Sequence, residues 1–174
     1  DSPMDDEQVG EEVYISMVNK AEKYCWFITP YLIITDEMTH ALCLAAKRGI
    51  DVRIITPGIP DKKMIYSVTR SFYHGLVKNG VRIYEWTPGF CHAKMSVADD
   101  CMATCGTINL DYRSLYHHFE NGCFMADCQA VLDIRNDLAA TMDECREVTE
   151  QYSTGRSAYL RLGQLFMRLF AGLL

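Results

Sequence analysis

The chain has 174 residues, the length of one domain, and such a domain buries roughly 70% of its unfolded surface without disulfides or metals. Its composition, 49% hydrophobic and 23% charged, is that of a soluble globular protein. A net charge of −6 argues against a general nucleic-acid binder, because such proteins carry a surplus of basic residues. Since no uncharged apolar run reaches about 18 residues, we expect no membrane-spanning helix.

The first half of the chain alternates between helical and extended patterns. An acidic, Pro-containing segment at residues 1–8 reads as a linker. Thr35 can cap the second helix, and Gly49 can end it. Asp61 can cap the third helix, which Gly80 follows. We predict helices over residues 9–23, 38–47 and 61–79, and strands over 24–31, 50–56 and 81–86.

The second half adds an antiparallel pair of strands and two further helices. Asp99 and Asp100 form the turn of a predicted hairpin, and residues 109–114 are predicted to be a loop or a short helix. We predict strands over residues 93–98, 102–105 and 120–126, and helices over 129–150 and 157–174. The pattern predicts an α/β fold with a mixed sheet flanked by helices on both faces. We divide the chain into a linker (1–8), a domain (9–155) and a C-terminal apolar helix (156–174).

A histidine and a lysine stand two positions apart where the hairpin begins. On a strand, His92 and Lys94 would point to the same face. Lys94 can hold phosphate oxygens as a point charge, and His92 can move a proton or bond covalently. An isolated histidine and lysine at this spacing usually form only the polar face of a strand. A neutral imidazole beside an ammonium group also suits attack on an anionic phosphorus centre.

The pattern of His92, Lys94 and Asp99 resembles the signature of the phospholipase D superfamily. The following stretches resemble the second, C-terminal catalytic half of bacterial cardiolipin synthases: residues 29–31, 45–53, 80–84, 106–115 and 119–121. The resemblance implies α/β/α layers and a phosphatidyl transferase that converts two phosphatidylglycerol molecules into cardiolipin and glycerol. It implies no cofactor and no metal.

The resemblance also implies roles for five side chains. A phosphohistidine forms and breaks during the reaction, and we interpret His92 as the general acid and base that serves a nucleophilic histidine elsewhere. Lys94, Asn109 and Thr107 are expected to hold phosphate oxygens. Glu120, at the start of a strand, is expected to hydrogen-bond the histidine and fix its tautomer.

Other polar residues near the motif are expected to serve the structure or the solvent. Asp99 belongs to the family's catalytic motif, but we interpret it as an anchor more than a proton carrier. Arg113 is expected to pair with Asp111 or a neighbouring carboxylate, and His117 and His118 are expected to be solvated.

One copy of the motif supplies only one of the two histidines that the chemistry needs. We therefore expect a missing N-terminal catalytic half, and an inactive fragment without it. The parent would meet its phospholipid substrate at the cytoplasmic face of the bacterial cell membrane, held by N-terminal spans, with no nucleic-acid partner. The alternatives are a homodimeric phosphodiesterase or nuclease, with two copies meeting across a twofold axis, and an inactive lipid-binding module. The C-terminal helix could contact membrane or protein.

The eight cysteines contain no Cys-x-x-Cys pair. Most stand in apolar runs, so we expect buried free thiols and a reducing compartment. A zinc site would need four ligands such as Cys91, His92, Cys101 and Cys105, but their spacing matches no common zinc finger.

Overall fold

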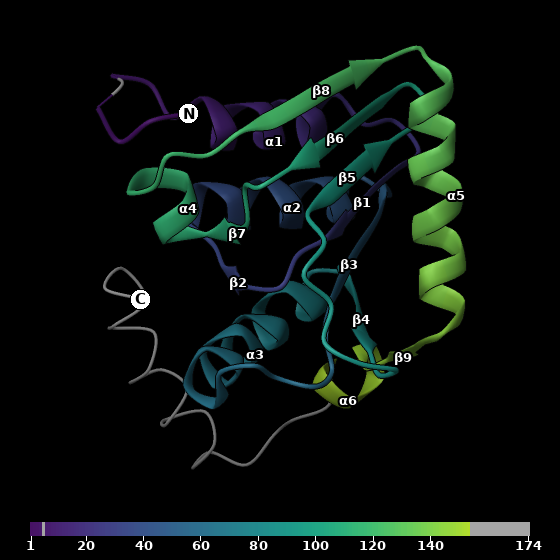
Figure 1. Ribbon diagram of the computed structural model, residues 1–174. Helices are drawn as coiled ribbons and strands as arrows, with labels where there is room; N and C mark the ends of the chain where they lie inside the picture. Colours follow the sequence, from purple (N-terminus) through teal and green to yellow (C-terminus); the bar gives the residue numbers. More distant parts are fainter. Residues whose placement is uncertain (5, 154–174) are drawn as a thin grey trace.

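Figure 1 shows the computed structural model, which describes residues 1–4 and 6–153 of the chain. The helix expected over residues 157–174, and the domain boundary before it, lie outside the described residues.

A mixed sheet of seven strands, in the order β8-β6-β5-β1-β3-β4-β9, runs through the middle of the molecule (Figure 1). The strands β1, β3 and β4 are parallel to one another, and every other pairing in this sheet is antiparallel. A second, small sheet pairs two short strands in parallel. The strands are β1 (Tyr24–Ile28), β2 (Leu32–Ile33), β3 (Asp51–Pro57), β4 (Arg82–Trp86), β5 (Met95–Ala98), β6 (Met102–Gly106), β7 (Leu110–Asp111), β8 (Gly122–Ala126) and β9 (Cys145–Glu147).

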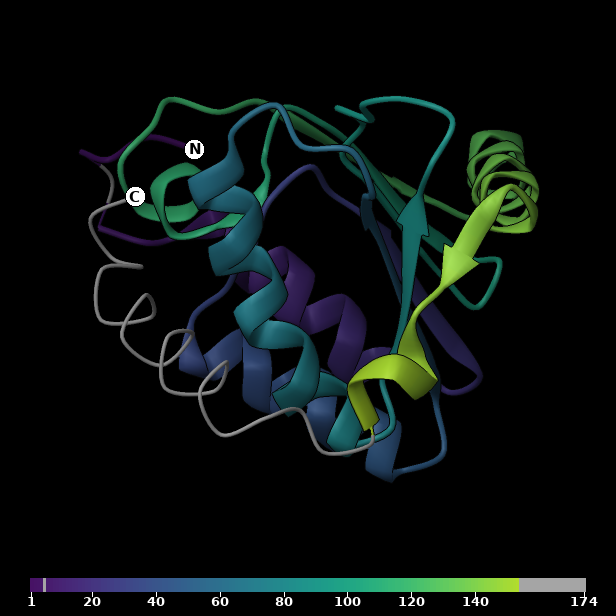
Figure 2. The same ribbon diagram turned by 90° about the horizontal axis from the view of Figure 1, so that it is seen from below.

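Helices cover both faces of the large sheet. Figure 2 shows α1, α2 and α3 on one face and α5 on the other. The larger apolar core lies under the first three helices, and a smaller one lies under α5. The predicted α/β class with helices on both faces of a mixed sheet is therefore confirmed. The helices are α1 (Val9–Lys20), α2 (Asp36–Lys47), α3 (Lys63–Lys78), α4 (Tyr112–Tyr116), α5 (Gln129–Asp143) and α6 (Thr149–Ser153).

Local signals in the sequence set several of these boundaries. The Thr35 hydroxyl accepts a hydrogen bond from the backbone N–H of Met38, which caps α2 as predicted. Gly49 and Gly80 follow α2 and α3 with φ of 92° and 99°, a left-handed conformation that favours glycine after a helix. Asp61 does not cap α3; it accepts from the backbone N–H of Lys62, whose side chain provides no cap.

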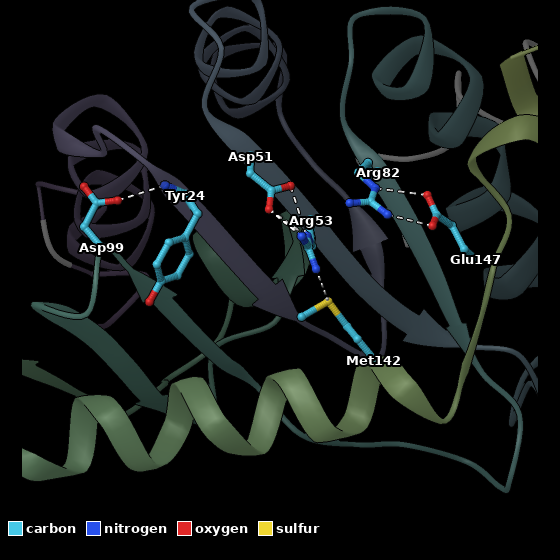
Figure 3. A network of polar contacts seen from close by, with 7 residues as sticks. All are labelled: Tyr24, Asp51, Arg53, Arg82, Asp99, Met142 and Glu147. Carbon is cyan, nitrogen blue, oxygen red and sulfur yellow. Dashed lines mark hydrogen bonds and ion pairs between the residues drawn. The ribbon is translucent and has the colours of Figure 1, made fainter.

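The long helix predicted over residues 129–150 is wrong. The chain leaves α5 after Asp143 and adds β9 to the free edge of β4. Arg82 donates two hydrogen bonds to Glu147, as Figure 3 shows, and Val148 N–H donates to the Ile83 carbonyl. Pairing with the sheet therefore overrides the helical periodicity of this segment, which continues in α6 only from Thr149.

Two further expectations about burial and helix ends also need correction. The first helix ends at Lys20, before its predicted end at residue 23. Of the eight cysteines, all free, Cys25 and Cys43 alone are buried. Several of the others lie on β6, β8 and β9, at or near the sheet's edges, where apolar neighbours in sequence do not guarantee burial. No helix among the described residues is long and apolar enough to cross a bilayer.

Candidate functional site

His92 and Lys94 lie side by side, as predicted, but not on a strand. Both precede β5, which begins at Met95, the residue that pairs with Ile28 at the end of β1. Two residues after Ile28 stands Pro30, which has no N–H for a sheet ladder. The Lys94 ammonium nevertheless lies 2.9 Å from Nδ1 of His92 and donates to the His92 carbonyl at 2.6 Å.

This contact selects a tautomer of the His92 ring. An ammonium group has hydrogens and no lone pair, so Nδ1 of His92 accepts and Nε2 carries the proton. Burial and the neighbouring Lys94 charge both lower the pKa of His92, and burial lowers the pKa of Lys94. With its proton on Nε2, the ring presents an N–H donor there and has no lone pair on Nε2 for attack.

Thr107 and Glu120 form a pair close to Lys94. The Thr107 hydroxyl donates to the Glu120 carboxylate and accepts from the backbone N–H of Asn121 at 2.9 Å. The Glu120 side chain is 9% exposed, and its charge raises the pKa of Lys94 against the effect of burial. In the described structure Glu120 accepts a hydrogen bond from Thr107 and forms none with His92, the partner that the sequence predicted. It precedes β8 and does not begin it.

Asn109 is held at the start of a short polar turn. Its side-chain nitrogen donates to the Ser114 hydroxyl at 2.8 Å, and its side-chain oxygen is buried without a hydrogen-bond partner. Asp111 caps α4 by accepting from the Ser114 N–H at 2.7 Å. Burial raises the pKa of Asp111, and the hydrogen bonds from Ser114 and Asn109 oppose that rise.

Asp99 lies at the far end of β5 from His92, in the predicted turn. Its carboxylate accepts from the backbone N–H groups of Glu22, Lys23 and Tyr24 at 2.6–2.9 Å; Figure 3 draws the last of these contacts. Asp99 and Asp100 both have positive φ, 53° and 60°, as tight hairpin turns of this kind require. Ala93, Lys94 and the four residues of β5 separate Asp99 from His92 along the chain.

A polar pocket of about 120 Å³ adjoins these residues and brings in three side chains to which the sequence assigned no role at the site. Lys62, Arg113 and His118 line it together with Asn109 and Tyr31. Arg113 does not pair with Asp111 or with any other carboxylate in the described structure, because Asp111 instead caps α4. Tyr31 and Lys62 are distant in sequence from Arg113 and His118, so no local sequence pattern indicates that they meet.

Aromatic side chains lie next to His92, and one of them, Tyr31, also lines the polar pocket. The Tyr31 ring lies edge-on to the His92 ring, with centroids 6.4 Å apart, and its hydroxyl donates to Asp61 at 2.6 Å. The Phe90 ring also lies next to the imidazole, with ring centroids 5.8 Å apart. In the described part of the chain, no three His, Cys, Asp or Glu side chains lie close enough together to hold a metal ion.

The family model described as "Cardiolipin synthase, PLD-like domain" matches residues 14–142. A cardiolipin synthase of Halalkalibacterium halodurans is 32% identical over 96% of this chain and 33% of its own length. An uncharacterized protein of Streptococcus mutans is 49% identical over the whole chain and 38% of its own length. The chain thus spans about a third of the length of the curated relatives it matches.

Solved structures share the fold at low sequence identity. Phosphatidylserine synthase from Haemophilus influenzae superimposes with a TM-score of 0.70 at 17% identity, over 94% of this chain and 44% of its own. Nuc from Salmonella typhimurium, a phospholipase D family member, gives 0.69 at 15% identity, over 79% of this chain and 89% of its own.

Proposed function

Because the chain belongs to the family of phospholipase D-like domains of cardiolipin synthases, we propose that it is one catalytic half of such a synthase. The parent would join two phosphatidylglycerol molecules into cardiolipin and release glycerol. The observation that carries this proposal is the His92–Lys94 contact, which leaves a proton on Nε2 and a cation beside it. A second histidine, from the missing half, would be the nucleophile.

The proposed reaction has two steps that balance at this histidine. The partner histidine attacks the phosphorus of the donor lipid, and the bond to the glycerol oxygen breaks. His92 gives that oxygen its Nε2 proton while Nδ1 takes a proton from the Lys94 ammonium 2.9 Å away, so the ring stays neutral. A primary hydroxyl of the acceptor then gives its proton to Nε2, Nδ1 returns its proton to Lys94, the hydroxyl oxygen attacks phosphorus, and the phosphorus–nitrogen bond breaks. General acid–base catalysis of this kind typically contributes about 10²–10⁴-fold.

Neighbouring residues would hold the phosphate and the lysine. The Lys94 ammonium makes two contacts with His92 and has a third hydrogen for a phosphate oxygen. We assign the side chain of Asn109 to the same phosphate. Glu120 and Thr107 are positioning residues, since Glu120 acts on the charge of Lys94 and Thr107 orients that carboxylate. Asp99 anchors the hairpin that carries the motif.

The membrane setting of the parent is part of the same proposal. Phosphatidylglycerol is a bilayer lipid, so the enzyme would work at a membrane surface. The cysteines are free and several are exposed, which favours the cytoplasmic, reducing side.

The acid role of His92 can be tested by changing the leaving group in the full-length parent. The His92→Ala variant should lose roughly 10³-fold or more of its cardiolipin formation, since both steps need the proton carrier. A phosphatidyl ester of p-nitrophenol should still release one p-nitrophenolate per active site, because that leaving group needs no proton. The trapped phosphoryl group should map to a histidine of the first half.

The controls decide between the roles. A His40→Ala variant, on the exposed side of α2, should behave as the wild type. A phosphoryl adduct on His92 of the wild-type enzyme would reverse the assignment, and an unchanged rate of cardiolipin formation in His92→Ala would refute the proposed function.

A further inference from the structure

The polar pocket beside His92 has the size and lining of a site for a small anionic group. Its volume is about 120 Å³, where roughly 10–15 Å³ suffices for one water molecule. That space suits a phosphodiester headgroup and is too small for an acyl chain. Three basic side chains line it: Lys62 before α3, Arg113 on α4 and His118 after α4.

The positive charge of this pocket is not used within the described structure. The side chains of Lys62 and Arg113 are exposed and make no hydrogen bond or ion pair among the described residues, and Lys62 contacts Asp61 only through its backbone N–H. His118 approaches Glu120 at 3.8 Å. In a chain of net charge −6, two unpaired cations at one pocket are a local reversal of the overall charge.

One carboxyl group, that of Asp111, also lines the pocket. Asp111 is buried, and its Oδ1 accepts from the Ser114 N–H at 2.7 Å. Burial raises its pKa, so its negative charge is disfavoured relative to an exposed aspartate. The pocket therefore has two cationic side chains, Lys62 and Arg113, and one carboxyl group whose charged form is disfavoured.

The pocket adjoins the proposed reaction centre without coinciding with it. His92 and Lys94 do not line it, but Tyr31 does, and the Tyr31 ring contacts the His92 ring. Asn109, assigned above to the donor phosphate, also lines the pocket. A ligand in the pocket would therefore lie next to the phosphate held by Lys94.

We propose that this pocket binds the phosphodiester anion of the acceptor lipid, with Lys62 and Arg113 as the residues that favour an anionic acceptor over a neutral one. The inference rests on the proposed function. The acceptor phosphatidylglycerol carries its own phosphate, and its attacking hydroxyl lies at the other end of a single glycerol unit. Two phosphates must therefore lie one glycerol apart in the product, and the second needs cations of its own.

The test compares two acceptors that share a hydroxyl and differ in charge. The full-length parent is given phosphatidylglycerol in phosphatidylcholine vesicles with deuterated glycerol in the water. Mass spectrometry then follows cardiolipin, formed from the anionic acceptor, and deuterated phosphatidylglycerol, formed from the neutral one. The variants are Lys62→Ala, Arg113→Ala and the double variant, with Arg113→Lys to retain the charge. Lys63→Ala is the matched control, because Lys63 is exposed but does not line the pocket.

We expect the double variant to form cardiolipin at least about tenfold more slowly, which corresponds to roughly 1.4 kcal/mol. Exchange with glycerol should stay within about twofold, which also shows that the variant is folded and active. Arg113→Lys should recover part of the loss, and Lys63→Ala should leave both products unchanged. Equal losses of both products, no loss, or the same loss in Lys63→Ala would overturn the inference. A wild-type parent that makes neither product would instead refute the proposed function.

Discussion

The contact between Lys94 and His92 fixes the tautomer of the imidazole, and the Lys94 charge adds to the lowering of the His92 pKa by burial. The sequence pattern predicted that these two side chains lie together, with Asn109, Thr107 and Glu120 near them, because the motif is local and specific. It could not predict that Nδ1 contacts the lysine, since that depends on side-chain rotamers. It also could not predict that Thr107 and Glu120 contact each other, since they are brought together only when β8 pairs with β6.

Removal of the lysine charge should raise the pKa of His92. Burial is the larger cause of its lowered pKa and the Lys94 charge is the second, so Lys94→Gln should recover part of the shift. An NMR titration of the His92 ring in both proteins measures this change directly. An unchanged or lower pKa in Lys94→Gln would show that the ammonium does not lie beside the ring, and His40 in the same spectra is the internal control.

Asp99 is expected to matter for stability. Replacement by alanine leaves three backbone N–H groups without their acceptor and places alanine at a φ of 53°. We expect the free energy of unfolding in urea to fall by about 1–3 kcal/mol. Asp99→Asn should lose less, since asparagine tolerates this backbone and keeps one oxygen. A stable Asp99→Ala variant would contradict the anchoring role.

At the scale of elements, sequence patterns predicted most helices and strands where one segment decides its own conformation. The caps of α2, the glycines after α2 and α3 and the hairpin turn are such cases. The predictions failed where a contact distant in sequence determines the local conformation. β9 pairs with β4, and the short β2 and β7 pair with each other. Helix α1 ends before the backbone N–H groups that donate to Asp99. The hydrophobic periodicity of one segment contains no information about such contacts.

The pairing of β6 with β8 depends on glycine at one position. A Cβ on Gly106 would lie 2.3 Å from the carbonyl oxygen of Asn121, closer than atoms can approach. Gly106→Ala should therefore separate the strands, lower the melting temperature and displace Thr107 from Glu120. Gly75→Ala is the control, since no atom of the described residues beyond its own helical turn lies within 4 Å of a Cβ there, and alanine should stabilise α3 by about 0.5–1 kcal/mol. Equal melting temperatures of Gly106→Ala and the wild type would contradict the close packing.

The ion pair between β4 and β9 should make stability depend on acid pH. The hydrogen bond from Arg82 lowers the pKa of Glu147 to about 2 from 4.5, so its contribution is present above pH 4.5 and is lost as the pH falls through about 2. Both side chains are exposed (40% and 38%), so solvent screening limits the contribution to roughly 1 kcal/mol or less.

Urea unfolding of wild type and Glu147→Gln across this pH range measures the contribution. The difference between them should shrink toward pH 2. A difference that stays constant would mean that the pair seen in Figure 3 does not form in solution. Glu22→Gln, at an exposed glutamate outside any ion pair of the described residues, is the control.

At the scale of the whole molecule, the family and the layered fold followed from the sequence because the motif and the alternating elements extend over most of the chain. The pocket did not, because Lys62, Arg113 and Tyr31 come from three separate segments that only the fold brings together. One histidine motif also means that this chain offers half of the proposed chemistry, and the other half has to come from a second domain or a second copy.

Sedimentation equilibrium of the 174-residue chain, with a phosphodiesterase assay on the same sample, tests this central claim most directly. The account predicts a monomer that does not hydrolyse phosphodiesters, because His92 lacks its nucleophilic partner. A dimer whose activity disappears in His92→Ala would contradict it, since two copies of this chain would then complete one site and the twofold, nuclease-like alternative would hold.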